Sequence, residues 1–127
     1  MNCPKCHALM EEVVFQDVQV DRCTNCKGVW LDEFEREDLR WLKGSEVIDV
    51  GKGGVGKQFT KIDQVPCPKC GGDNLMIRAR DLQQLHIWFE QCRVCNGVFF
   101  DAGEFRDLKD DSIGDFLKDL IHNLRKL

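Results

Sequence analysis

Eight cysteines in four Cys-x-x-Cys pairs constrain the fold of this 127-residue chain more than any other feature. A Cys-x-x-Cys turn offers two thiolates to one metal ion, and two such turns supply the four tetrahedral ligands of a structural zinc site. No cysteine is left over when the pairs are combined in chain order. The sequence therefore predicts two zinc sites. The ligands are Cys3, Cys6, Cys23 and Cys26 in site 1, and Cys67, Cys70, Cys92 and Cys95 in site 2.

The two predicted sites lie in an internal repeat. Cys-Pro-Lys-Cys begins at both Cys3 and Cys67, and in each unit the last cysteine is followed, one residue later, by Gly-Val, two large apolar residues and Asp. We infer a duplication, with one unit over residues 1–42 and the other over 66–110. The glycine-rich segment 43–65 between them is interpreted as a linker.

Each unit is expected to form a zinc ribbon, in which a β-hairpin joins the two cysteine pairs and a short third strand follows. Gly28 and Gly97, two residues past the last cysteine of each unit, are expected to adopt a left-handed backbone. Runs of β-branched and aromatic residues predict the strands. They are expected over 11–15, 18–22 and 29–31 in the first unit, over 75–80, 86–90 and 98–100 in the second, and over 46–50 and 58–62 in the linker.

Three helices complete the predicted fold, a small zinc-stabilised α+β protein. Asp32 and Asp101 follow the third strands, and a glutamate stands three residues after each, which is the spacing of a capping box. This pattern predicts helices over 33–42 and 102–109. Apolar residues at helical spacing predict an amphipathic helix over 111–127, either packed on the protein itself or forming an interface with a partner or a second copy of the chain.

Metal is also favoured over the other uses of paired cysteines. A disulfide within Cys-x-x-Cys would close a very small ring, and a thioredoxin-like motif needs a preceding strand, for which Cys3 lies too near the start of the chain. Iron in the same tetrahedral sulfur cage remains an alternative to zinc. A unit of about 40 residues cannot bury enough apolar surface to fold alone. We therefore expect both units to depend on their metal.

Charge and hydropathy narrow the class of partner. The formal net charge is −4, and two tetrathiolate zinc centres would take it to about −8, which disfavours nucleic acid as the default partner. There is no apolar run of the length that a membrane helix needs, and the first residues lack the pattern of a secretory leader. We expect a cytoplasmic protein with no membrane partner.

The motifs resemble those of a known family. Cys-Pro-x-Cys, a hairpin and then Cys-x-x-Cys-x-Gly-Val-Trp-Leu-Asp-x-x-Glu are similar to the TFIIB-type zinc-finger family of small bacterial proteins. Residues 3–35 match this pattern, and 67–104 match it with Phe99 and Phe100 in place of Trp and Leu. The resemblance implies a ribbon fold and gives the ligand role to the eight cysteines. It implies little about the biological role, because fold does not fix function.

From the sequence we expect a zinc-binding adaptor that has no enzymatic activity and that binds another protein, with transcription or translation machinery as candidate partners. Two alternatives remain open. One is a ribbon that binds nucleic acid or regulates transcription, since Arg78, Arg80 and Arg93 fall near the second hairpin. The other is a zinc or redox sensor, which needs a labile and exposed metal site.

Overall fold

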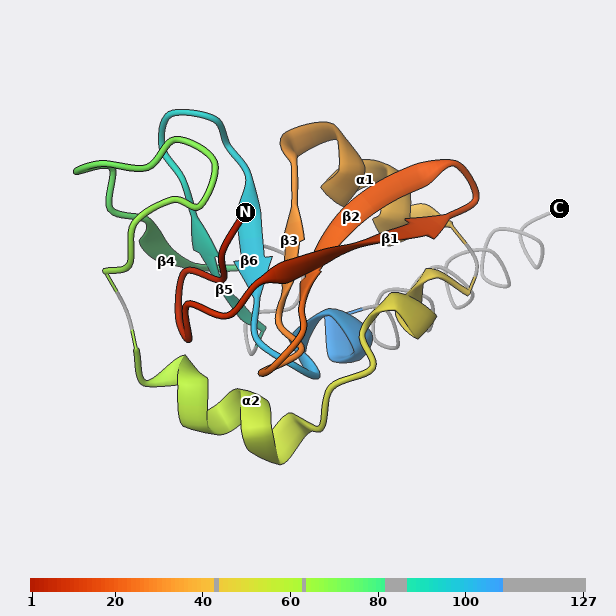
Figure 1. The fold of residues 1–127 in the computed structure, drawn as a ribbon. Helices are drawn as coiled ribbons and strands as arrows, with labels where there is room; N and C mark the ends of the chain where they lie inside the picture. The colour runs from red at the N-terminus through yellow and green to blue at the C-terminus, as the bar shows by residue number, and fades with distance from the viewer. Residues whose placement is uncertain (43, 63, 82–86, 109–127) are drawn as a thin grey trace, which may run out of the picture.

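The fold is that of a computed structural model, which describes residues 1–42, 44–62, 64–81 and 87–108. Its strands belong to one six-stranded sheet with the order β1-β2-β3-β6-β5-β4 (Figure 1). The amphipathic helix that the sequence predicts over 111–127 lies outside the described residues. The strands are β1 (Met10–Phe15), β2 (Val18–Cys23), β3 (Val29–Leu31), β4 (Ile77–Arg80), β5 (Trp88–Gln91) and β6 (Val98–Phe100).

The two units meet at the centre of this sheet. In each unit a hairpin carries a short third strand, and the third strands β3 and β6 pair with each other in antiparallel register. Trp30 lies opposite Phe99, its own equivalent in the other unit, so the pair marks a pseudo-two-fold axis. The duplication seen in the sequence is thus a near-symmetry of the fold, with the ribbons joined edge to edge.

Gly28 and Gly97, which follow the last cysteine of each unit, lie at this junction. A Cβ on Gly28 would lie 2.2 Å from Cζ of Phe99, and a Cβ on Gly97 would lie 2.3 Å from Cζ2 of Trp30. The expected left-handed backbone at these glycines is wrong, because the positive φ angles belong to the preceding residues, Lys27 (65°) and Asn96 (60°). Glycine is required here because an aromatic ring of the other unit packs directly on its backbone.

Side chains alternate between the two faces of the sheet. The middle residues of β3 and β6, Trp30 and Phe99, lie in a buried cluster with the cysteines and Met76. Their neighbours point the other way, and this second cluster includes Leu31 and Phe100. The cysteines therefore lie on one face of the sheet, and an aliphatic and aromatic core lies on the other.

Helix α1 (Glu33–Trp41) follows β3 and packs on the core face, where Leu39 is completely buried. Asp32 and Glu35 form the predicted capping box, and the backbone amide of Asp32 donates to Oε2 of Glu35 at 2.8 Å. The helix begins there because two of its otherwise unpaired amide groups find carboxylate partners.

The segment between the units is helical, so the strands predicted over 46–50 and 58–62 are wrong. A 3₁₀ turn, η1 (Ser45–Ile48), is followed by α2 (Gly53–Thr60), which lies along one side of the sheet (Figure 1). Two of the glycines that indicated a loose linker, Gly51 and Gly56, are contact residues. A Cβ on Gly56 would lie 2.0 Å from the carbonyl oxygen of Ala102, so only glycine lets α2 pack this closely.

A pair of alanine substitutions in α2 tests this packing. Gly56→Ala should destabilise the zinc-loaded protein by about 1–3 kcal/mol, because the added methyl group collides with the backbone of Ala102. Gly54→Ala is the matched control, since nothing lies within 4 Å of its Cβ position and alanine favours the helix. Urea denaturation measures both. Equal stability of the two variants would contradict the packing of α2 on the second unit.

The second unit differs from the first where its helix begins. Residues 104–108 are helical, but the side chain that caps them is not that of Asp101. Asp49, just before α2, accepts from the amides of Gly103 and Arg106 at 2.9 Å each. The predicted capping box at Asp101 is therefore wrong, because a carboxylate from the connecting segment caps the helix and the Asp101 carboxylate bonds elsewhere.

Candidate metal centres

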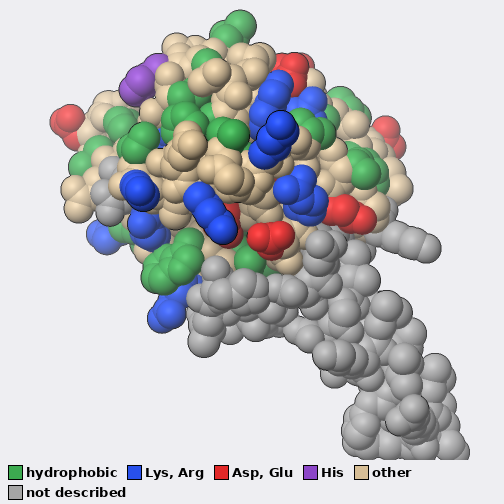
Figure 2. All heavy atoms as spheres, turned by 90° about the horizontal axis from the view of Figure 1, so that it is seen from below, with side chains coloured by type: hydrophobic (Ala, Val, Ile, Leu, Met, Phe, Trp, Pro, Cys, Tyr) green, Lys and Arg blue, Asp and Glu red, His purple; other side chains and the backbone are tan. Residues whose placement is uncertain are grey.

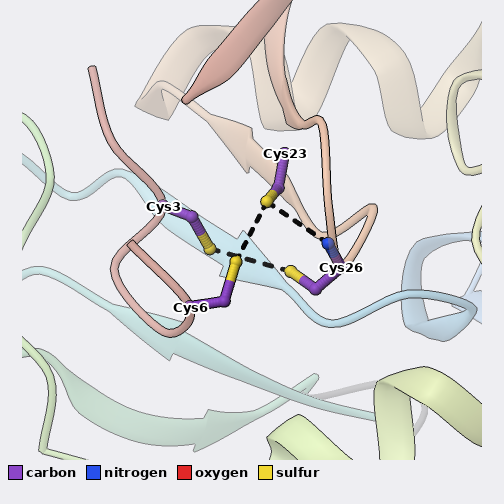
Figure 3. Close-up of side chains that lie close together, drawn as sticks. All are labelled: Cys3, Cys6, Cys23 and Cys26. Carbon is purple, nitrogen blue, oxygen red and sulfur yellow. Dashed lines mark hydrogen bonds between the residues drawn. The ribbon is translucent and has the colours of Figure 1, made fainter. Parts of the chain in front are cut away.

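Site 1 lies between the turn at the start of the chain and the turn after β2. The four sulfur atoms of Cys3, Cys6, Cys23 and Cys26 converge within 4.8 Å of one another (Figure 3). The Sγ atoms of Cys3 and Cys26 are 3.7 Å apart, and those of Cys6 and Cys23 are 3.2 Å apart. Each ligand pair therefore contributes one sulfur to each of these short contacts.

Site 2 repeats this arrangement around the turn at 67–70 and the turn after β5. The sulfur atoms of Cys67, Cys70, Cys92 and Cys95 again lie within 4.8 Å of one another. The distance from Cys67 Sγ to Cys95 Sγ is 3.7 Å, and that from Cys92 Sγ to Cys70 Sγ is 3.9 Å. The structure thus brings together all eight cysteines that the sequence singled out, in the two sets of four.

The geometry of both clusters fits zinc. A tetrahedron with Zn–S bonds of about 2.3 Å has sulfur atoms about 3.8 Å apart. Three of the four distances lie close to this value, and the Cys6–Cys23 distance is shorter, at 3.2 Å. A disulfide would need about 2.05 Å. Backbone amides also point at the sulfurs, from Asn25 to Cys23 at 3.3 Å and from Val94 to Cys92 at 3.4 Å. Such donors stabilise thiolates, and thiolates bind zinc.

The thiols of one site ionise unequally. The hydrogen bond with Cys26 lowers the pKa of Cys3 to about 5, while the same bond raises the pKa of Cys26. In site 2, burial raises the pKa of Cys67 to about 12. Four thiolates therefore coexist only around a cation, and binding zinc must release protons. Zinc affinity should fall as the pH falls.

The two sites differ in exposure, and this predicts the order in which they lose zinc. Site 1 has three buried cysteines, whereas in site 2 Cys70 is exposed and Cys95 is half-buried. A chelator reaches exposed ligands first, so site 2 should release its zinc before site 1. Mass spectrometry of thiols alkylated during a chelator titration measures the order. Earlier labelling of Cys3 and Cys6 would contradict it.

A buried ion cluster next to site 1 escaped the sequence analysis. Lys5, inside the first Cys-Pro-Lys-Cys turn, places its Nζ 3.0 Å from Oε1 of Glu90 and 2.8 Å from Oδ2 of Asp101, both from the other unit. All three side chains are almost fully buried. Lys5 also donates to the carbonyl of Phe59, and Thr60 donates to Asp101 at 3.1 Å. The cluster therefore joins both units and α2.

The equivalent lysine–aspartate pair on the other side of the pseudo-two-fold axis is exposed to solvent. Lys69, in the second Cys-Pro-Lys-Cys turn, lies 3.3 Å from Oδ1 of Asp32, with 53% and 41% of the two side chains exposed. The repetition of lysine and aspartate at equivalent positions was the available sequence signal. This signal does not predict that the Lys5–Asp101 pair is buried beneath α2 while the Lys69–Asp32 pair stays at the surface.

The sheet with its two four-cysteine clusters defines a tandem zinc-ribbon protein. The chain belongs to the transcription factor zinc-finger family, whose model of the TFIIB zinc-ribbon type matches residues 2–40 and 66–111. This confirms the resemblance found in the sequence, and the two clusters account for two zinc ions. Comparison with curated proteins and with solved structures gave no match. None of the helices in the described residues is long and apolar enough to cross a membrane.

Proposed function

We propose that the chain is a zinc-stabilised adaptor in the cytoplasm that has no enzymatic activity and binds another protein. Four cysteines fill each site, so neither cluster keeps the open position at which a catalytic zinc binds water or substrate. The zinc ions then act as structural elements that hold a surface in shape. Components of the transcription or translation machinery are the partners to test first.

The observation that carries the proposal is the exposure of Phe34 in the first unit. Phe34 is 79% exposed, and Leu9 and Val14 are 66% and 64% exposed. Single exposed apolar residues are ordinary, but a phenylalanine this exposed on a chain with so small a core is characteristic of a contact surface. Aromatic side chains are also the usual anchors of protein interfaces.

Affinity capture followed by reconstitution tests the adaptor. The zinc-loaded full chain and its Phe34→Asp variant serve as baits in a lysate of the source organism. A protein retained by the first bait and lost with the second is purified, and its dissociation constant is measured by calorimetry. We expect at least a tenfold weaker complex with the variant. No protein binding to either bait, or any turnover by the purified chain, would contradict the proposal.

A second candidate, nucleic-acid binding, is favoured by the face around α2. Residues 51–61 contain Lys52, Lys57 and Lys61, all exposed, and no acidic residue. Figure 2, which views the molecule from below, shows Lys and Arg side chains spread over this face with few acidic ones between them. On the second hairpin the guanidinium of Arg80 lies 4.9 Å from the ring centre of Trp88. Basic and aromatic side chains together suit a single strand.

Salt dependence separates this candidate from the adaptor. If α2 binds a phosphate backbone, the affinity for single-stranded DNA or RNA should fall steeply as salt rises. Replacing Lys57 and Lys61 by alanine should weaken it and reduce the slope. Fluorescence anisotropy measures both. Absence of binding at low salt would remove this candidate and leave the protein adaptor.

A further inference from the structure

The seat of α2 on the second unit shows what kind of element this fold accepts. We call Lys5, Asp101, Ala102 and Gly103 the closed seat. Lys5 donates to the carbonyl of Phe59 near the end of α2 at 3.0 Å, and Asp101 accepts from the hydroxyl of Thr60 at 3.1 Å. The closed seat therefore binds a short helix through an ion pair that meets its last turn.

The pseudo-two-fold axis generates a matching position on the first unit. Lys69, Asp32, Glu33 and Phe34 are the equivalents of the four residues above, and we call them the open seat. The lysine–aspartate pair is present there too, at 3.3 Å, but both side chains are about half exposed. Phe34 is 79% exposed, so within the described residues this position has no covering helix.

The charge around the open seat selects its occupant. Glu12 and Asp21 lie opposite each other across the β1–β2 pair, and Asp21 faces Trp30 just as Glu90 faces Phe99, so Asp21 is the equivalent of Glu90 in the Lys5 cluster. Asp32 and Glu33 add two carboxylates to the open seat itself. Lys69 is the one basic residue named in the open seat. By contrast, the segment of α2 over 51–61 carries three lysines and no acidic residue. A helix that lies on the open seat should likewise be basic, because opposite charges attract across an interface.

We infer that the open seat docks a short basic helix of another protein, held by the Lys69–Asp32 pair and by apolar contact with Phe34. This inference rests on the proposed adaptor function and names its surface and its partner class. The chain's own tail is a poorer fit, because residues 111–127 hold three basic and three acidic residues and carry no net charge. The α2 helix of a second copy is already held in its own closed seat.

The residues that differ between the two seats determine how closely a helix can approach each of them. Ala102 and Gly103 allow the backbone of α2 to approach closely, and a Cβ on Gly103 would lie 3.0 Å from Cα of Gly53. Glu33 and Phe34 stand at the equivalent positions of the open seat and are both exposed. An incoming helix must therefore lie farther out, with apolar side chains against Phe34 and a basic residue near Glu33.

Nuclear magnetic resonance on the zinc-loaded full chain tests the open seat directly. The probe is a synthetic amphipathic helix with leucines on one face and lysines on the other, and the control probe carries glutamates in place of lysines. We expect saturable shifts of the amide signals of residues 32–34 and 69 with the basic probe alone. The double variant Glu33→Gln, Phe34→Ala should bind the probe at least tenfold more weakly.

Val47→Ala provides the matched control, since Val47 is 62% exposed and lies beyond the far end of α1. Native mass spectrometry should find two zinc ions in every variant, which shows that the fold is retained. Shifts confined to other residues, equal binding of the two probes, or a dimer that the double variant abolishes would overturn the inference. If a protein retained by both the unaltered chain and the Phe34→Asp bait also binds the double variant, the adaptor stands and the open seat fails.

Discussion

Removal of both zinc ions should unfold the chain. Five of the ten residues in the buried cluster on the zinc face are themselves cysteine ligands, and Trp30 and Phe99 pack among them. Without a cation the thiolates repel one another or take up protons, and nothing then holds the cysteines of the cluster together. A structural zinc contributes about 10–16 kcal/mol at neutral pH, more than a domain of this size retains in net stability.

The measurement is circular dichroism and tryptophan fluorescence during dialysis against a strong chelator. We expect loss of the near-ultraviolet signal and full recovery when two equivalents of zinc are returned. Since each aromatic residue at the junction packs on a glycine of the other unit, the loss should be one cooperative transition. Retained tertiary signals in metal-free protein would show that zinc is dispensable for the fold. Iron in the protein as isolated would change the identity of the metal.

Replacing Lys5 by methionine should destabilise the protein by about 3–5 kcal/mol, because Glu90 and Asp101 would stay buried without their cation. The same change at Lys69 is the matched control. Its ion pair with Asp32 is roughly half exposed, so the expected loss of stability is much smaller than that at Lys5. Denaturant titration of the zinc-loaded variants measures both values.

A triple variant separates the lost ion pair from lost packing. Lys5→Met combined with Glu90→Gln and Asp101→Asn removes all three buried charges and should recover part of the stability. An equal effect of the substitutions at Lys5 and Lys69 would mean that the cluster is not buried as described. Failure of the triple variant to recover would attribute the cost to packing of the lysine stem.

The metal ligands and the capping box at Asp32 could be predicted because each depends on residues close in sequence. A Cys-x-x-Cys turn and a cap three residues before its glutamate are local patterns. The pairing of β3 with β6 could not be predicted from the sequence, because a strand of three residues carries no signal that identifies its partner strand. The glycines of α2 misled for the same reason: Gly56 is explained by Ala102, which lies far along the chain.

Asp101 shows where prediction from local sequence patterns fails. Its spacing to Glu104 repeats that of Asp32 to Glu35, and local reasoning gives both the same role. The Asp101 carboxylate instead accepts hydrogen bonds from Lys5 of the other unit and from the hydroxyl of Thr60 in α2. The amide of Gly103, which Asp101 would have capped, donates to Asp49. Equal sequence patterns diverge when tertiary neighbours differ.

The β3–β6 junction has the form of an isologous interface, in which a residue and its own equivalent face each other across a two-fold axis. A homodimer of single ribbons would use such a contact. In a homodimer the same sequence sits on both sides, so any helix that seals one side must seal both. Fusion of the halves into one chain removes that obligation, and one polypeptide can cover the position on the second unit while leaving the equivalent position on the first unit exposed.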